Sequence, residues 1–365
     1  MFQKLLLLIM FSAFTFTTLS AQDEFFEPKS TIGGYGELHY NWSKDDGADD
    51  AKKTLDFHRF VLFYSHSWTE KWSFKSEIEL EHNFVKDGEG ELELEQAYIN
   101  YHHSDAFGFQ VGVILPSVGF INEYHEPPLF LSVERPEYSK NIIPTTWFGN
   151  GAAVYGRFSD FSYKATVMEG LNGAKILADG KIRSGRQKGY KSNAQELLYN
   201  ARVDYTGIEG LWLGSSFSYN DAFVGVDSTI STTLFEVHAK YDANNVIAVF
   251  EYGNIAYDGE DVGFMVESAM GYYFDLGYNI APIFDLDGKL IPWVRYTDYN
   301  TAASVIGGGD AEQKAHYTKW MLGLSVKPID QVVFKIDYGV KTNELKNGTK
   351  DFETALFNFG AGYMF

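Results

Sequence analysis

Apolar and polar residues alternate with a period of two along most of this chain, and this alternation constrains the fold more than any other feature. Between residues 74 and 84 the odd positions are polar, and between 332 and 340 the even positions are apolar or aromatic. Successive side chains of a β-strand point to opposite faces, so each such segment has one apolar and one polar face. The pattern predicts strands rather than helices.

Sixteen segments of this kind follow one another, and many are 10 to 15 residues long, as strands that cross a bilayer at a tilt are. Tight turns alternate with longer loops along the chain, and the longer loops are 43–53, 117–145, 172–195 and 300–314. Short turns on one side and long loops on the other are typical of outer-membrane barrels. The predicted strands are residues 31–42, 54–67, 71–85, 91–103, 107–116, 146–158, 161–171, 196–206, 211–221, 230–241, 246–257, 262–275, 289–299, 315–327, 331–342 and 352–365.

Composition separates this fold from its alternatives. The 365 residues are 45% hydrophobic, 22% charged and 17% aromatic, and no run of 18 apolar residues follows residue 21, which excludes a bundle of membrane-spanning helices. A soluble β-sandwich would need polar residues on both outer faces. Continuous acidic faces opposite apolar faces with aromatic residues near the strand ends favour lipid outside and water inside. We therefore predict an all-β fold, a transmembrane antiparallel β-barrel over residues 31–365.

The first 21 residues are typical of a secretory signal peptide. Lys4 precedes an apolar stretch from Leu5 to Phe16, which is too short to span a membrane as a helix, and Leu19-Ser20-Ala21 is similar to a cleavage site. The alternative is a retained N-terminal anchor. Residues 22–30 would then form a short periplasmic segment. The chain has no cysteine, which excludes disulfides, thiolate zinc sites and thiol nucleophiles.

The last strand carries a second indication of compartment. Phe357, Phe359, Ala361, Tyr363 and Phe365 alternate with other residues to the end of the chain. A terminal Phe in such a pattern resembles the signal that the outer-membrane insertion machinery reads. With the signal peptide, it predicts the outer membrane as the location, with its lipid and lipopolysaccharide and the insertion machinery as partners.

Residues 117–145 form a loop of about thirty residues, the third on the external side by parity. Loops of this length in compact folds are uncommon and usually functional. Its apolar residues are too many for a segment that floats in water, so we expect it to pack against the barrel interior. They are Phe120, Leu129, Phe130, Leu131, Ile142 and Ile143.

Several short motifs carry a family resemblance. They are Ile32-Gly33-Gly34-Tyr35-Gly36-Glu37 and Glu95-Gln96-Ala97-Tyr98-Ile99 in two strands, and Asn122-Glu123, His125-Glu126-Pro127-Pro128, Glu134-Arg135-Pro136 and Ile143-Pro144-Thr145-Thr146-Trp147 in the loop. With these motifs the chain resembles bacterial general porins, and more narrowly the phosphate-selective O/P-type porin family. The resemblance implies a water-filled channel for passive diffusion of ions and small hydrophilic solutes, narrowed by an inward third loop, and assembly as a homotrimer.

Charged residues of the loop and wall are the candidate site. The formal charge of −19 argues against nucleic acid as a partner, and we interpret it as favouring cations over anions in the pore. Wall bases that face loop acids would create a transverse field; we expect this of Arg59, Lys75, Arg295, Lys319 and Lys335. The constriction candidates are Glu123, Glu126, Glu134, Arg135 and Glu137, and the wall candidates are Arg59, Lys75, Glu77, Glu79, Glu81, Glu95, Arg202, Arg295, Lys319 and Lys335.

Other functions have weaker support in the residues. Six histidines fall in the first four predicted strands, which permits a metal-binding or pH-responsive site, although strand histidines are more often polar groups of the lumen or rim, and no metal or cofactor is predicted. Enzyme motifs such as His-Glu-x-x-His are absent. A barrel hydrolase would need a serine or aspartate beside a histidine, and an adhesive or structural barrel would not conduct. The histidines are His39, His58, His66, His82, His102 and His103.

Overall fold

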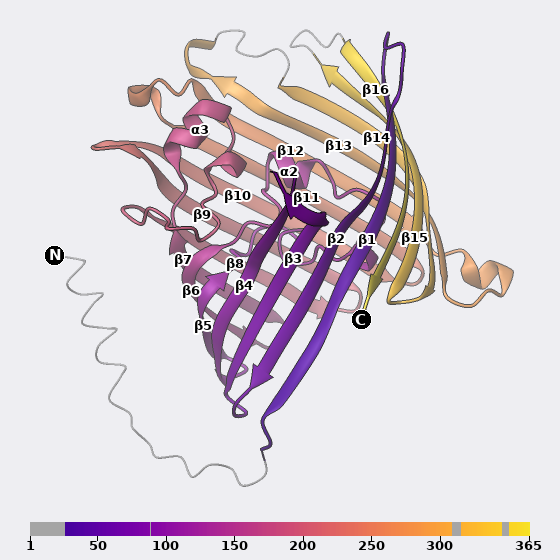
Figure 1. Cartoon of the computed structure of the whole chain (residues 1–365), viewed down its shortest axis with the longest axis horizontal. Coiled ribbons are helices and arrows are strands. Elements are labelled where there is room, and N and C mark those ends of the chain that lie inside the picture. Colours follow the sequence, from indigo (N-terminus) through magenta and orange to yellow (C-terminus); the bar gives the residue numbers. More distant parts are fainter. Residues whose placement is uncertain (1–25, 88, 309–314, 345–349) are drawn as a thin grey trace.

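The computed structural model describes residues 26–365 except 88, 309–314 and 345–349, and these residues form a closed antiparallel barrel of sixteen strands (Figure 1). Each strand pairs with its neighbours in sequence, and β1 pairs with β16 to close the cylinder. The predicted signal peptide lies outside the described residues. In the described part of the chain, no helix is long and apolar enough to cross a membrane.

All sixteen predicted strands are confirmed, with ends that differ by a few residues. The largest extensions lie on the external side, where β1, β9 and β13 continue beyond their predicted ends. The strands are β1 Lys29–Asp45, β2 Lys52–Ser67, β3 Trp72–Lys86, β4 Glu89–Ser104, β5 Phe107–Ile114, β6 Gly149–Phe158, β7 Phe161–Glu169, β8 Leu197–Ile208, β9 Leu211–Gly225, β10 Ser228–Ala243, β11 Val246–Asp258, β12 Val266–Tyr278, β13 Lys289–Val305, β14 His316–Ile329, β15 Val332–Glu344 and β16 Lys350–Met364.

The barrel places its apolar side chains outside and its charged side chains inside. In β15, Phe334 and Ile336 are 44% and 41% exposed, whereas Lys335 and Asp337, which alternate with them, are 4% and 2% exposed. This arrangement inverts that of a soluble protein, because the outer face of such a barrel contacts lipid. It confirms the face assignment made from the alternation.

Closure of the cylinder depends on small residues at the seam between β1 and β16. The Gly34 N–H donates to Phe365 O at 3.0 Å, and the Phe365 N–H donates to Gly34 O at 2.9 Å. A Cβ on Gly34 would lie 2.2 Å from the Val61 carbonyl oxygen, so only glycine fits here. The glycines of the first predicted strand thus allow three strands to approach closely.

Helical segments are short and lie in the connections. Two of them, η1 and α2, belong to the third external loop, which runs from residue 115 to residue 148 and is called the inward loop below. Figure 1 draws α2 within the outline of the strand cylinder and α3 near the end where external loops gather. The segments are η1 Pro127–Leu129, α2 Tyr138–Asn141, α3 Gly173–Asp179, η2 Ile182–Gly185, η3 Glu260–Val262, η4 Ala281–Phe284 and η5 Ile306–Gly308.

Candidate pore constriction and its flanking cavities

The inward loop lies in the lumen, because it forms hydrogen bonds with wall residues on several sides of the barrel. The Ser117 N–H donates to Asn200 Oδ1 of β8 at 3.0 Å, and the Val133 N–H donates to Asp337 Oδ2 of β15 at 2.8 Å. Glu134 accepts a hydrogen bond of 2.8 Å from the Asn41 amide of β1. A segment that contacts β8 on one side of the cylinder and β15 and β1 on the other crosses the interior, as the apolar content of the loop predicts.

Apolar packing holds the second half of the loop against one wall. Tyr138, Ile142 and Ile143 are at most 1% exposed and belong to one hydrophobic cluster with Leu234 and Tyr273 of the barrel wall. Burial of each large side chain contributes about 1.5–3 kcal/mol. The loop therefore has a fixed position in the lumen.

Glu137, the residue before α2, joins the loop to the wall by charge. Its carboxylate lies 3.1 Å from Lys319 Nζ and 2.7 Å from Lys341 Nζ, and the Tyr299 hydroxyl donates to it at 2.9 Å. Burial raises the pKa of Glu137, but the two ammonium groups outweigh this effect and lower the pKa to about 2. Of the predicted pairs between wall bases and loop acids, Lys319 with Glu137 is one that forms.

Other bases of the wall form pairs that were not predicted. Lys164 and Arg202 bind Glu123, with oxygen-to-nitrogen distances of 3.0 and 3.2 Å. Arg295 pairs with Asp275 of the neighbouring strand, with Nε 2.5 Å from Oδ1, and donates to Ser132 of the loop.

Lys335 and Lys75 also depart from the prediction. Lys335 donates to the Ser132 carbonyl at 2.7 Å, and Lys75 is exposed in the cavity that Glu123 also lines. The expectation that wall bases pair with loop acids was wrong for Arg59 and Arg295, whose partners are carboxylates of adjacent strands, and for Lys335, which donates to a loop carbonyl. Lys75 makes no such pair with the described loop residues but lines the same cavity as Glu123. Glu126 lies half-buried, with one oxygen buried and without a hydrogen-bond partner.

Arg59 lies at the centre of the predicted acidic wall. Its guanidinium nitrogens lie 2.6, 3.2 and 3.4 Å from carboxylate oxygens of Glu37, Glu79 and Glu81, respectively. The register places Glu79 opposite Glu93 and Glu81 opposite Glu91, so acids of β3 and β4 face one another. Bases offset the repulsion that this register creates.

His125 and Arg135 of the inward loop cover the rest of this wall. His125 Nε2 lies 3.4 Å from Glu77 Oε1 and 3.6 Å from Glu95 Oε2, and both glutamates are at most 2% exposed. Arg135 donates to the His125 carbonyl at 3.3 Å. Glu77, Glu79 and Glu95 are thus buried under the loop. The alternation alone indicates that they face water in the lumen, but the loop covers them instead.

A second loop adds bases that the sequence pattern did not identify. Lys188, in the connection between β7 and β8, pairs with Glu91 at 2.8 Å and with Glu93. Arg186 donates to the Thr145 and Thr146 carbonyls of the inward loop at 2.8 and 2.6 Å. Burial, together with nearby Arg183, lowers the pKa of Arg186 to about 10, so it remains charged at neutral pH.

Two polar cavities lie against different parts of the inward loop. The external cavity has a volume of about 770 Å³, and the cavity on the side of the tight turns about 790 Å³. Glu134, Arg135 and Glu137 line the first, whereas Glu123 and Tyr124 line the second. The inward loop therefore forms part of the lining of both cavities.

Basic residues outnumber acidic ones in both linings. Eight Lys or Arg and four Glu line the external cavity. Four Lys or Arg and three acids line the other. The external bases are Lys52, Arg59, Arg135, Lys140, Lys181, Arg183, Lys319 and Lys341, and the external acids are Glu37, Glu81, Glu134 and Glu137.

Several histidines lie within hydrogen-bond reach of a serine or aspartate, as a barrel hydrolase would need: the pair of His66 with Ser30 is exposed, whereas that of His238 with Asp204 is enclosed. His238 Nε2 lies 2.9 Å from Asp204 Oδ1, and His238 Nδ1 lies 2.7 Å from Glu236 Oε1. The His238 side chain is fully buried, with its ring 4.4 Å from that of Phe120. Hydrogen bonds occupy both ring nitrogens of His238, and Phe120 of the inward loop packs against the ring, so this group holds the loop against the wall.

Comparison with known proteins gives three concordant findings. A model of the family described as phosphate-selective porin O and P matches residues 32–279. An uncharacterized protein of Aquifex aeolicus (strain VF5) is 34% identical over 329 residues, which cover 84% of this chain and 74% of that protein. The solved structures that are similar to this chain include a porin and an outer membrane protein.

The first is an anion-selective porin from Comamonas acidovorans, with a TM-score of 0.62 and 11% identity over 93% of this chain and 100% of that one. The second is the trimer form of OmpT, an outer membrane protein of Vibrio cholerae, with a TM-score of 0.57 and 16% identity over 92% and 99%. At these identities the structural likeness shows the fold.

Proposed function

Because the chain belongs to the family of phosphate-selective porins O and P, we propose that it is an outer-membrane channel through which small hydrophilic solutes diffuse passively, with a preference for anions. The family and the barrel make it an outer-membrane porin. The narrowing of the channel by the inward loop, the ion preference and the assembly are the parts that we propose.

The inward loop is the proposed constriction. It is fixed by apolar packing on one side and by ion pairs on the other, and it borders a cavity on each side. A solute that passes from one cavity to the other moves along Glu123, Glu126, Glu134, Arg135 and Glu137. Charged side chains at such a passage determine which ions cross.

The excess of bases in the external cavity is the observation that carries the anion preference. A net charge of −19 favours cations when the whole chain is considered, and we drew that expectation from the sequence. A permeating ion, however, experiences the charges that line its path. Eight bases against four acids there support anions, and the name of the family model, phosphate-selective, is consistent with small oxyanions as solutes.

Reversal potentials in planar bilayers test this proposal. Under a gradient of potassium chloride, the wild type should give the sign expected for anion preference. Lys140→Glu combined with Lys181→Glu should shift the potential toward cations, because both residues line the external cavity. Lys175→Glu is the matched control and should leave the potential unchanged. Lys175 is exposed and lies in the same connection as Lys181, but it lines neither cavity.

Two outcomes would contradict the proposal. A wild-type potential of the cation-preferring sign would restore the preference inferred from net charge. Absence of any conductance from folded protein would instead favour a structural or adhesive barrel.

We also propose export by a signal peptide over residues 1–21, insertion through recognition of the strand that ends at Phe365, contact with lipopolysaccharide, and a homotrimer. The trimer form of the Vibrio cholerae protein supports the last of these. The mass of the protein in detergent, measured by light scattering, distinguishes a trimer from a monomer.

A further inference from the structure

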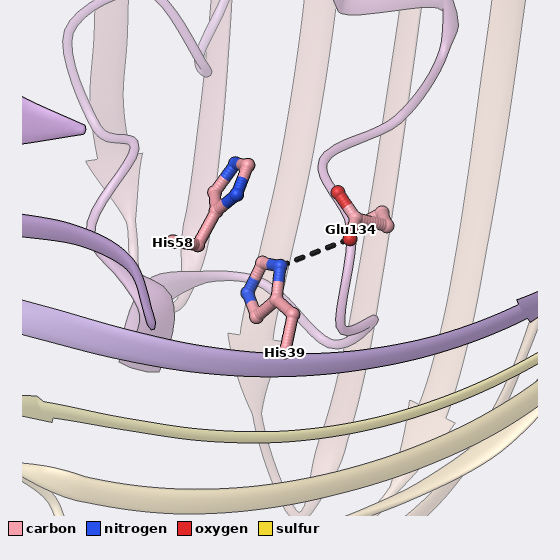
Figure 2. Close-up of side chains that lie close together, drawn as sticks. All are labelled: His39, His58 and Glu134. Atoms are coloured by element: carbon pink, nitrogen blue, oxygen red, sulfur yellow. Dashed lines mark ion pairs between the residues drawn. The ribbon is translucent and has the colours of Figure 1, made fainter. Parts of the chain in front are cut away.

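Three histidines and two carboxylates lie together on the external side of the lumen, where β1, β2 and β3 meet the inward loop. His39 Nδ1 lies 2.9 Å from Glu134 Oε1, and the His39 and His58 rings stack with centroids 4.6 Å apart (Figure 2). His82 and His58 each lie within 2.9 Å of the same oxygen of Asp56. His39, His58 and Glu134 offer ligand atoms within 4.8 Å of one another.

Two irregularities of the backbone assemble this group. The register between β1 and β2 shifts after Glu37, which pairs with Arg59, while Leu38 pairs with Phe57, so that His58 is an extra residue in a β-bulge. The bulge lets both His58 and Arg59 face the lumen, although they are adjacent in sequence. Bulges commonly redirect a side chain next to a functional site.

The second irregularity lies at the external end of β3. His82 and Asn83 have φ angles of 56° and 67°, in the left-handed region that residues other than glycine rarely adopt. By strict alternation His82 would share the apolar face of β3 with Ile78 and Leu80. The left-handed turn brings its ring to Asp56 instead, and such strain is concentrated at functional sites.

The hydrogen bonds leave one nitrogen of each inner histidine directed to the same place. His39 Nε2 is 3.1 Å from Glu37 Oε2, which leaves the Nδ1 atom facing Glu134 Oε1 at 2.9 Å. His58 Nδ1 is 2.9 Å from Asp56 Oδ2, which leaves Nε2 as its remaining ligand atom. Histidines that bind metals almost always donate their other N–H to a carboxylate, a backbone carbonyl or water, and here both partners are carboxylates.

We propose that His39, His58 and Glu134 bind a divalent transition-metal ion of the zinc class in the external cavity. Two imidazoles and one carboxylate are a ligand set that Zn²⁺ uses when water completes the coordination. Two bonds of about 2.0–2.1 Å at a tetrahedral centre separate their ligand atoms by about 3.3 Å, close to the 2.9 Å between His39 and Glu134. One of the stacked rings turns about χ2 to bring its nitrogen into line with the ion.

The site would connect the inward loop to the barrel wall, since Glu134 belongs to the loop and both histidines to strands. Glu37 and Asp56 are positioning residues, and His82 supports Asp56 from the far side. The ion would add positive charge to a cavity that bases already line. The proposal stands whether the channel prefers anions or cations, because it concerns binding rather than permeation.

Calorimetric titration of the folded, metal-free full chain with zinc chloride in detergent tests the site. We expect saturable binding of one ion per chain. His39→Gln and His58→Gln should each remove this binding, and Asp56→Asn should weaken it by about 10–100-fold through loss of the positioning carboxylate. His66→Gln is the matched control, because His66 is on β2 but bonds to Ser30 outside the group.

Each variant is first checked for the heat-dependent electrophoretic shift of a closed barrel, so that only folded protein is compared. Absence of saturable binding by the wild type would overturn the proposal. So would binding that His39→Gln and His58→Gln leave unchanged. Loss of binding in His82→Gln together with full binding by His39→Gln would place the ion at Asp56, His58 and His82, and would overturn the assignment to the loop. Conductance measured without zinc tests the channel function separately.

Discussion

Arg59 lies among three carboxylates that approach it from β1 and β3, and it is 5% exposed. Removal of one partner from a buried ionic group leaves uncompensated charge, at a cost of about 3–5 kcal/mol. Arg59→Gln should therefore lower the free energy of unfolding by about that amount, measured by urea titration of tryptophan fluorescence in detergent. Lys44→Gln makes the same charge change at an exposed position and should have little effect. Equal stability of the two variants would contradict this prediction.

The contribution of Glu137 to the free energy of unfolding depends on pH in a defined direction. Its pKa is lowered from 4.5 to about 2, so its stabilisation is fully present above about pH 4.5 and is lost as the pH falls toward 2. The difference in unfolding free energy between wild type and Glu137→Gln should be up to about 3 kcal/mol from pH 5 to pH 8. Urea titrations at several pH values should show it shrink toward pH 2. A difference that grows on acidification would exclude the ion pairs with Lys319 and Lys341 as its source.

At the scale of elements, the strands could be predicted because each needs only the alternation of its own residues. The inward loop could be predicted as well, since Ile142 and Ile143 require a wall to pack against. What escaped prediction depends on departures from alternation. The bulge that turns His58 inward and the left-handed conformation of His82 carry no periodic signal, and the partners of Arg295 depend on register between strands.

The contact between the inward loop and the connection from β7 to β8 also depends on tertiary structure, and it can be tested. Arg186 donates to the Thr145 and Thr146 carbonyls, and a hydrogen bond from a charged group contributes about 1.5–3 kcal/mol. Arg186→Met should speed hydrogen exchange at the Thr145 and Trp147 amides by about tenfold or more, as measured by mass spectrometry. Lys175→Met, in the same connection, should not change their exchange. Unaltered exchange in Arg186→Met would show that apolar packing alone holds the loop.

At the scale of the whole molecule, the net charge is negative, whereas bases outnumber acids in the linings of the two cavities. Many acids are buried in the barrel wall, such as Glu77, Glu95 and Glu236, whereas the cavities collect bases from β2, the inward loop and the connection before β8. Composition counts all residues equally, and only closure of the barrel decides which of them face the lumen. The sequence therefore predicted the sixteen-strand barrel well and the composition of its cavities poorly.

The inverted distribution of apolar and charged residues gives the last prediction, which concerns the barrel in its membrane. Ile336 is 41% exposed in the middle of the apolar row of β15, between Phe334 and Tyr338. An arginine on the lipid face costs about 2–4 kcal/mol at the midplane and about 0–1 kcal/mol near the interface.

Ile336→Arg should thus lower the free energy of unfolding from lipid vesicles by about 2–4 kcal/mol. Asp287→Arg, in an exposed turn, introduces the same side chain outside the bilayer and should have almost no effect. In detergent micelles, where water reaches the belt more readily, the cost at Ile336 should fall. An equal loss for both variants in vesicles would mean that β15 presents its other face to lipid, and the lumen would then be lined by Phe334, Ile336 and Tyr338 rather than by Lys335 and Asp337.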